Sequence, residues 1–327
     1  MKPRSNFIIR KEYMKRITTL FFILLLLQAK AQNIDSVITM QSITQTVKYL
    51  SCDSLNGRLT GSAGAAAAAN YIRSFFKENS IHELQGVPNY FDSFKVYVKT
   101  TLATGVNVIG AIASNCKNDS IVVISAHYDH IGAGNDLPVN NNHGKTDLIY
   151  NGANDNASGV AAMLEIAKYY AALHSNRYNL LFIGFSGEEL GETGSQHFAK
   201  NIDNSLIKAV INFDMVGRPG FDDLNKCTVI SKDSYSIIWQ LNKSLSKKSG
   251  HKGAKFFIED THPEYNLYYR SDHYSFDGKV KKTFTLMTSS PSDEFYHTVK
   301  DEYQTIDFDF LLSTTKKIAL ACRVFIE

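Results

Sequence analysis

The sequence predicts an α/β fold: a single globular domain with a mostly parallel or mixed central β-sheet sandwiched by helices. Short apolar runs rich in β-branched residues alternate along the chain with longer amphipathic segments, which is the pattern of strands that alternate with helices. No internal repeat or low-complexity linker divides the 327 residues. A content of 44% hydrophobic and 20% charged residues suffices for one large buried core.

Residues 1–31 are excluded from this domain because they have the layout of a secretory signal peptide. A basic segment begins at Met14, residues 17–27 are apolar, and residues 29–31 form a small-x-small cleavage site. The apolar run is too short to span a membrane. We expect an upstream extension over residues 1–13, cleavage after Ala31, a mature domain over residues 32–327 and a secreted or periplasmic location. An uncleaved N-terminal anchor is the alternative.

The charge distribution argues against strongly anionic partners. The whole chain has a net charge of +3, but residues 1–31 hold seven Lys and Arg side chains and one acidic side chain, so the remaining chain has a net charge of −3. The basic charge therefore belongs to the targeting segment. We expect no nucleic-acid partner and no stable membrane association after signal cleavage. The sequence does not determine the oligomeric state.

Four cysteines lie in the mature domain, at Cys52, Cys116, Cys227 and Cys322. In an oxidising compartment they could form two disulfides in any of three pairings, and sequence alone does not choose between them. The sequence has no C-x-x-C motif, which argues against a zinc knuckle or a redox pair.

The hydrophobic periodicity of the sequence predicts where helices and strands lie along the chain. Helices are predicted over residues 35–50, 64–79, 159–174, 195–201, 235–249 and 308–325, and strands over residues 106–113, 121–126, 180–186, 209–213 and 283–287. Ser158 is placed to cap the helix that begins at Gly159. Sheets of this kind hold their active sites at the carboxyl ends of the strands. Polar residues at those ends are therefore the candidates for function.

His127 ends a predicted strand within the segment 125–130, SAHYDH. Asp129 is placed to accept a hydrogen bond from the other ring N–H of His127, which would fix the tautomer and raise the basicity of a ligating nitrogen. His130 has no such support and is interpreted as structural. His127 is thus a candidate metal ligand, with Asp129 as its supporting carboxylate.

Carboxylates stand at the ends of further predicted elements. Asp155 lies in an Asn- and Gly-rich turn that is as typical of a helix cap as of a metal site, but a loop carboxylate can bridge two cations. Glu188 and Glu189 repel each other unless a cation holds them, and one could ligate a metal while its neighbour stays free as a general base. Asp214 ends an apolar strand, where an unpartnered buried carboxylate is costly.

His297 lies in a polar loop ahead of the last predicted helix, where it could close the site. Together these residues form a nitrogen and oxygen ligand set for two zinc ions with one spare carboxylate. Calcium binding is the competing interpretation, but calcium prefers shells made only of oxygen. The sequence therefore predicts a hydrolase that uses a pair of metal ions.

The five segments that carry these residues resemble, in their order along the chain, the co-catalytic (di-zinc) aminopeptidase family. That family also contains glutamate carboxypeptidases and glutaminyl cyclases. The resemblance runs from about Leu50 to the C-terminus and includes the segments 56–62, NGRLTGS, and 270–273, RSDH. It implies a zinc exopeptidase-like fold. Asp272, His273 and residues 268–270 are interpreted as walling the pocket or bracing the fold.

The resemblance also implies a division of the ligands. Asp155 would bridge the two zinc ions, His127 and Asp214 would complete one site, and Glu189 and His297 would complete the other. Glu188 would then be the general base.

The resulting expectation is a secreted or periplasmic di-zinc metallopeptidase whose substrates are peptides. The expected activity is that of an aminopeptidase, in which a metal-bridging hydroxide attacks the peptide bond and Glu188 moves the proton. A metallocarboxypeptidase is the alternative, with Arg218 and Arg270 available to hold a substrate carboxylate. A glutaminyl cyclase, which by the resemblance uses a single metal, and an inactive binding module such as a transferrin-receptor ectodomain are further alternatives.

Overall fold

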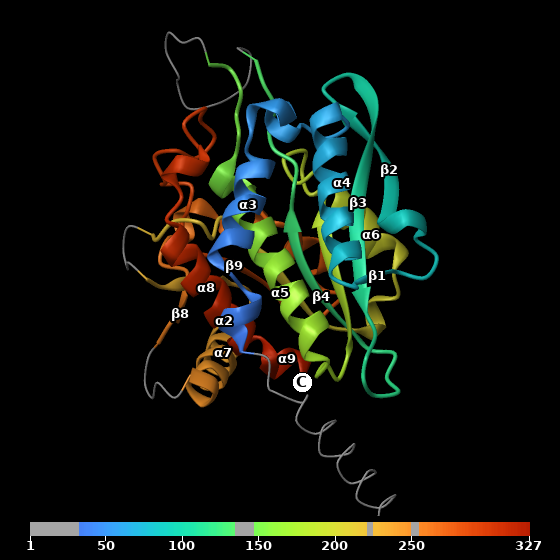
Figure 1. Ribbon diagram of the computed structural model, residues 1–327, viewed down its shortest axis with the longest axis vertical. Helices are drawn as coiled ribbons and strands as arrows, with labels where there is room; N and C mark the ends of the chain where they lie inside the picture. Colours follow the sequence, from blue (N-terminus) through green and yellow to red (C-terminus); the bar gives the residue numbers. More distant parts are fainter. Residues whose placement is uncertain (1–32, 135–146, 221–224, 250–254) are drawn as a thin grey trace, which may run out of the picture.

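A mixed β-sheet of nine strands forms the centre of the computed structural model, which describes residues 33–134, 147–220, 225–249 and 255–327 (Figure 1). The strands are β1 (His82–Glu83), β2 (Phe91–Val98), β3 (Thr101–Ile112), β4 (Ile121–His127), β5 (Asn179–Phe185), β6 (Ile207–Phe213), β7 (Cys227–Ile230), β8 (Phe257–Glu259) and β9 (Thr283–Met287). Their order is β1-β3-β5-β4-β6-β9-β7-β8, and β2 pairs with β3 off this path. The central strands β5, β4, β6 and β9 are mutually parallel, whereas β3 and β7 run antiparallel to their neighbours β5 and β9.

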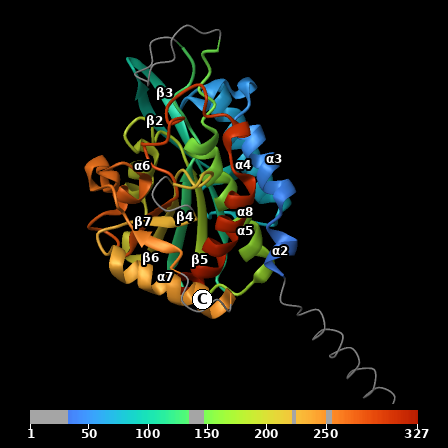
Figure 2. The same ribbon diagram turned by 90° about the vertical axis from the view of Figure 1, so that its left-hand side faces the viewer.

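Helices cover both faces of the sheet. They are α2 (Ile34–Val37), α3 (Met40–Leu50), α4 (Ala63–Glu78), α5 (Gly159–Leu173), α6 (Thr193–Asn201), α7 (Ser234–Ser249), α8 (Phe308–Ala321) and α9 (Arg323–Ile326). Figure 2 shows α3, α4, α5 and α8 on one side of the sheet and α6 on the other. The predicted α/β arrangement with a mixed central sheet is thus confirmed.

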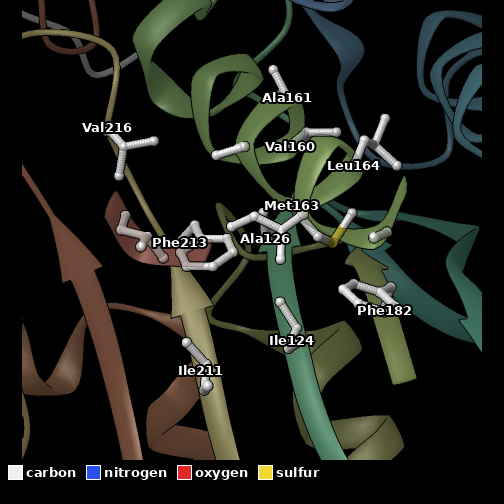
Figure 3. Packing of buried hydrophobic residues seen from close by; sticks show 14 of the residues in the cluster. Ile124, Ala126, Val160, Ala161, Met163, Leu164, Phe182, Ile211, Phe213 and Val216 are labelled. Carbon is white, nitrogen blue, oxygen red and sulfur yellow. The ribbon is translucent and has the colours of Figure 1, made fainter. Parts of the chain in front are cut away.

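Side chains of the central strands alternate between two cores, as the period of a strand requires. Val122 and Ile124 of β4 join the larger cluster under α5, and Val123 between them joins a second cluster that includes Phe198 of α6. Figure 3 shows the side chain of Met163 of α5 lying over the strand side chains of the first cluster. Both faces are therefore buried, which explains why these strands are largely apolar and why buried polar residues such as Ser125 of β4 and Asn212 of β6 hydrogen-bond to each other.

The parallel register brings the carboxyl ends of β4, β5 and β6 to one edge of the sheet. Ile124 of β4 lies beside Phe182 of β5 and Ile211 of β6. The residues that directly follow these strands therefore emerge together, and the expected site residues are among them.

Two predicted helices are each divided in the structure. The segment 35–50 contains α2 and α3, because Thr39 is extended and its side chain accepts a hydrogen bond from Ser42 N at the start of the new helix. The segment 308–325 contains α8 and α9, which meet at Cys322. The sequence pattern does not predict β1, β2, β7 and β8, because three of them have only two to four residues and β2 is polar on its exposed face.

The predicted cap at Ser158 is wrong. Ser158 is already helical and its hydroxyl donates to Asn154 O, while Asn156 Oδ1 accepts the hydrogen bond from Gly159 N at the start of α5. The amide of Asn156 replaces the hydroxyl because the chain makes a kinked turn over Ala153–Ser158, with non-helical backbone at Asp155 and Asn156, before α5 begins.

The cysteines can be followed in the structure, whereas the predicted signal peptide cannot. All four cysteines are free: Cys227 and Cys322 are buried, Cys52 is half-buried and Cys116 is exposed. The predicted signal peptide, residues 1–31, lies outside the described residues. Among the helices that the structure describes, none is both long and apolar enough to cross a membrane.

Candidate metal centre

Six imidazole and carboxylate side chains line one small cavity of about 30 Å³ at the carboxyl edge of the sheet. They come from the end of β4, the turn before α5, the turn after β5, the residue after β6 and a loop before α8, and they are His127, Asp155, Glu188, Glu189, Asp214 and His297. The structure thus brings together all six residues that the sequence predicts to surround the site.

Asp155 lies between the two imidazoles, with one carboxylate oxygen directed at each. Its Oδ1 is 3.3 Å from His127 Nε2, and its Oδ2 is 3.2 Å from His297 Nε2. The carboxylate is buried, so it is held in this position by its surroundings rather than by solvent. A single carboxylate with its oxygens divided in this way has the geometry of a bridge between two cations.

Each imidazole also faces a second carboxylate. His127 Nε2 is 3.6 Å from Asp214 Oδ1, and His297 Nε2 is 3.3 Å from Glu189 Oε2. Zinc bonds of about 2.0–2.2 Å in tetrahedral geometry place neighbouring ligand atoms roughly 3.3–3.6 Å apart. The observed separations therefore suit zinc, and the donor set of imidazoles and carboxylates suits it chemically.

The electrostatics show that these groups already interact as charged partners. Burial alone would lower the pKa of His297, but Asp155 and Glu189 outweigh burial and raise it from 6.5 to about 10. Burial alone would lower the pKa of His127 as well, and the carboxylates of Glu188, Asp155 and Asp214 hold it well above 6.5. In a site with so many carboxylates, cationic partners are strongly favoured.

The carboxylates respond in the opposite direction. Burial alone would raise the pKa of Asp155, but its hydrogen bonds with His127 and His297 hold the pKa well below the usual range. The pKa of Glu189 falls to about 2 in spite of burial and of repulsion by Asp155, because His130 and His297 contact its oxygens. Both residues are thus anionic at any working pH, as metal ligands must be.

Glu188 differs from its neighbour Glu189. Burial raises its pKa well above 4.5, and the nearby carboxylates of Glu189 and Asp214 raise it further against the opposing effect of His127. Its Oε2 lies 4.0 Å from His127 Nε2, and its side chain keeps 13% exposure at the cavity. Glu188 is therefore the acidic group of this cavity whose carboxyl can most readily gain and lose a proton.

Asp129 supports His127, but through a different atom from the one expected. His127 Nδ1 lies 3.2 Å from the backbone carbonyl oxygen of Asp129, whereas the nearest carboxylate oxygen is 3.8 Å away, beyond hydrogen-bond distance. The Asp129 carboxylate instead accepts hydrogen bonds from Thr60 Oγ1 at 2.8 Å and from Glu188 N at 3.3 Å. Asp129 thus positions both the imidazole and the backbone that carries Glu188.

His130, interpreted as structural from the sequence, contacts the site directly. Its Nδ1 is 2.7 Å from Glu189 Oε1 and 3.9 Å from Asp155 Oδ2, and the ring is buried. With Asp155, Glu189 and His297 it forms one group of ligand atoms within 4.8 Å of one another. The sequence feature that could have identified His130 as a site residue is its place in the segment 127–130, where His127, Asp129 and His130 lie at the end of one strand.

Arg58 in the segment 56–62 braces two of the site loops. Its guanidinium is fully buried and donates to the carbonyl oxygens of Tyr128, Asn151, Gly152 and Leu50. These carbonyls lie next to His127, in the turn before Asp155 and at the end of α3. Burial lowers the pKa of Arg58 only to about 10, so it remains a cation behind the acidic site.

Asp301 holds the Asp155 turn from the other side. Its carboxylate accepts hydrogen bonds of 3.0 Å from Asn154 N and Asp155 N, and it pairs with Arg218 Nη1 at 2.9 Å. Arg218 Nε donates in turn to Asp293 Oδ2 at 2.7 Å. Arg218 is therefore buried and engaged within the fold, and it is not available to hold a substrate carboxylate.

The segment 270–273 is divided between the cavity and the core. Ser271 Oγ donates to Asp214 Oδ2 at 2.7 Å, and His273 Nδ1 lies 2.8 Å from Thr285 Oγ1 in the core. Asp272 is buried, and burial raises its pKa to about 7. Arg270 alone of the four lines the cavity.

Comparisons with known proteins identify the family of this chain. Residues 107–322 match the model of peptidase family M28. The chain is 28% identical to Aminopeptidase YwaD of Bacillus subtilis (strain 168) over 215 residues, which are 63% of this chain and 41% of that protein. It is 29% identical to the alkaline phosphatase isozyme conversion protein of Escherichia coli (strain K12) over 165 residues, which are 48% of this chain and 46% of that protein. The matched part therefore spans less than half the length of these relatives.

Solved structures share the fold. A zinc aminopeptidase from Bacillus subtilis superimposes with a TM-score of 0.70 at 16% identity, over 90% of this chain and 97% of that one. The Porphyromonas gingivalis glutaminyl cyclase superimposes with a TM-score of 0.66 at 18% identity, over 88% and 98%. The family model matches more than half of this chain and includes the six imidazole and carboxylate residues of the cavity, and the chain therefore belongs to peptidase family M28.

Proposed function

We propose that this chain is a secreted or periplasmic di-zinc aminopeptidase that removes N-terminal residues from peptides. The observation that carries the proposal is the position of Asp155, whose two oxygens lie 3.3 and 3.2 Å from the Nε2 atoms of His127 and His297. One zinc ion would be held by His127, Asp214 and Asp155, and the other by His297, Glu189 and Asp155. His130 and Asp129 would orient these ligands from outside.

Zinc bound at these positions would polarise the scissile carbonyl and lower the pKa of water. The protein supplies the proton transfers. Glu188 lies at the cavity with a raised pKa, so it can accept a proton from the attacking water and deliver it to the departing amine. Its backbone N–H is held by the Asp129 carboxylate at 3.3 Å, which limits the positions that the side chain can take.

The cavity wall supports a substrate with an apolar first residue. Met215, Leu267 and Met287 are buried, belong to one apolar cluster and line the metal cavity beside the carboxylates. Side chains of this kind bind an apolar group by removing its surface from water. A leucyl compound is therefore the appropriate first substrate.

The test is the hydrolysis rate of leucyl p-nitroanilide by the mature, zinc-loaded protein, with the N-acetylated compound alongside and bound zinc measured by mass spectrometry. Cleavage of the free-amine compound alone, with two zinc ions bound, is the expected result. Cleavage of neither compound by protein that carries two zinc ions would overturn the aminopeptidase proposal.

A carboxypeptidase is the second candidate, and Arg270 is the observation that favours it. Arg270 lines the cavity, whereas Arg218 is engaged by Asp293 and Asp301. A carboxypeptidase would cleave N-blocked peptides with a free C-terminus, which the N-acetylated anilide does not have. N-acetyl-leucylglycine is therefore the substrate that separates the two candidates.

A further inference from the structure

Arg270 is a cation at the metal cavity whose hydrogen-bonding capacity is largely unused. Its side chain is exposed, and its guanidinium donates to Tyr296 Oη at 3.1 Å and to Tyr265 O at 3.5 Å. A guanidinium carries five N–H donors. Arg270 thus has further donors free to bind another group at the cavity.

No carboxylate of the described residues lies within ion-pair distance of Arg270. Arg218 shows the contrast, because it is buried and its guanidinium pairs with both Asp293 and Asp301. Arg218 therefore braces the fold, whereas Arg270 has the exposure and the free donors of a residue that binds a ligand.

The positive charge of Arg270 is not needed to balance the carboxylates of the cavity. The cavity is lined by four carboxylates, those of Asp155, Glu188, Glu189 and Asp214. Two zinc ions, which belong to the proposed function, would offset these four negative charges. Arg270 is therefore not needed to neutralise the site, and its charge is available to an anionic part of the substrate.

Tyr296 fixes where that charge lies. Its ring stacks on the imidazole of His297 with ring centroids 3.9 Å apart, and its hydroxyl accepts the hydrogen bond from Arg270. Tyr296 thus lies between the guanidinium of Arg270 and the imidazole of His297, and it contacts both. A carboxylate one or two residues from the bond being cleaved would fall within reach of the guanidinium.

We propose that Arg270 determines specificity by binding a carboxylate of the substrate peptide. This inference rests on the proposed peptidase function and names the substrate class: short peptides with a carboxylate close to the scissile bond. A planar guanidinium binds such a group through two parallel hydrogen bonds. The carboxylate could be the free C-terminus of a dipeptide or an acidic side chain, and the test distinguishes these sources.

The test compares peptides that differ only in the carboxylate. Leucylglycine is set against leucylglycinamide. For an acidic side chain after the scissile bond, the α-amide of leucyl-aspartic acid is set against that of leucyl-asparagine, and for one before it, glutamyl-glycinamide is set against glutaminyl-glycinamide. Each is assayed with wild-type protein, Arg270→Gln, Arg270→Lys and the control Arg177→Gln. Arg177 is exposed and precedes β5, at the opposite end of that strand from Glu188.

We expect wild-type kcat/KM to favour at least one carboxylate peptide over its neutral counterpart by about 10- to 100-fold, the range for a hydrogen bond to a charged group. Arg270→Gln should bring that ratio to about one, mainly through KM. Arg270→Lys should retain part of the preference, and Arg177→Gln should leave it unchanged. A wild-type ratio near one for every pair, or a ratio that survives in Arg270→Gln, would overturn the proposal.

A binding measurement separates this proposal from the proposed function. Analogues of all three peptide pairs with a reduced, uncleavable bond are titrated calorimetrically into zinc-loaded protein. Tighter binding of the carboxylate analogue in at least one pair, lost in Arg270→Gln, supports Arg270 even if turnover is absent. Equal binding within every pair by a protein that hydrolyses leucyl p-nitroanilide counts against Arg270 and leaves the aminopeptidase function intact.

Discussion

The carboxylate of Asp301 accepts a 3.0 Å hydrogen bond from the backbone N–H of Asp155, the residue whose side chain lies between the two imidazoles of the candidate metal centre. The same carboxylate accepts a second bond from Asn154 N and pairs with Arg218. One buried residue in the loop before α8 thereby sets the position of the turn that precedes α5. The candidate bridging ligand depends on this contact for its orientation.

Replacing Asp301 should loosen the Asp155 turn. In Asp301→Asn the amide can accept fewer hydrogen bonds and leaves Arg218 without one of its charged partners, so we expect a loss of about 3–5 kcal/mol in the free energy of unfolding. Zinc affinity should fall roughly 10- to 100-fold. Urea unfolding and competition with a zinc chelator measure the two effects. Asp119→Asn, in an exposed loop, is the control, and equal behaviour of the two variants would contradict the role given to Asp301.

Arg58 should contribute to stability through the carbonyls that it joins. Arg58→Lys keeps the charge but cannot reach the four carbonyl oxygens that Arg58 contacts, at Leu50, Tyr128, Asn151 and Gly152. Since each buried unsatisfied group costs about 1–3 kcal/mol, we expect at least about 2 kcal/mol of destabilisation. Chemical unfolding of the metal-free protein measures it. A change below about 0.5 kcal/mol, as is usual for surface substitutions, would show that the contacts are dispensable.

Glu188→Gln should separate metal binding from turnover. Gln keeps the shape of the side chain but cannot accept the proton, so kcat should fall by about 10²- to 10⁴-fold while both zinc ions remain bound. Glu192→Gln in the same turn is a matched control, because Glu192 does not line the metal cavity. Zinc content and kcat are measured on the same preparation. A Glu188→Gln enzyme with near-normal turnover would assign the proton transfer to another group.

Zinc binding should release protons. The pKa of His297 is raised to about 10 and that of His127 lies well above 6.5, so both imidazoles carry a proton at neutral pH in metal-free protein. Zinc binds the neutral imidazole, and we expect about two protons to be released from these residues. Calorimetric titration in buffers of different ionisation enthalpy counts them. Release of none would show that the imidazoles are neutral before metal binds.

The same pKa shifts predict how metal-free stability depends on pH. A pKa that is raised on folding stabilises the protein fully below the unfolded value, near 6.5 for His297, and this contribution is lost as the pH rises through about 10. Metal-free protein should therefore lose stability between about pH 7 and pH 10. Thermal unfolding across that interval tests this, with the single variant His297→Gln expected to show a weaker pH dependence.

The sequence shows the main elements because their apolar periodicity is set by local geometry. The runs at 121–126 and 209–213 match β4 and β6 closely, since strands buried on both faces are largely apolar. The polar residues within these runs, Ser125 and Asn212, hydrogen-bond to each other. The same rule fails for β2, whose exposed face is polar, and for β7 and β8, which are too short to produce a pattern. The breaks in the first and last helices are not predicted either, because each depends on a local backbone conformation at Thr39 or Cys322.

The candidate site is visible in the sequence for a related reason. His127 ends β4 and Asp214 directly follows β6, and because these strands run parallel, the positions of the two residues in the sequence already imply that they emerge at one edge of the sheet. Asp129 is correctly associated with His127, but the contacting atom could not be predicted from the sequence. The geometry of the turn decides whether the backbone carbonyl or the side-chain carboxylate of Asp129 faces the imidazole.

The α/β fold and the polar residues that follow β4, β5 and β6 can be read from the sequence alone, because apolar periodicity is a local property and parallel strands end at a common edge. Asp155 and His297 lie in a turn and a loop, and tertiary contacts bring them to that edge. The environment of each residue likewise depends on the tertiary structure. The tertiary structure placed His130 against Glu189, engaged Arg218 within the fold and left Arg270 at the cavity. These outcomes depend on contacts between residues far apart in the chain, and no local pattern in a sequence encodes which of two similar side chains finds a partner.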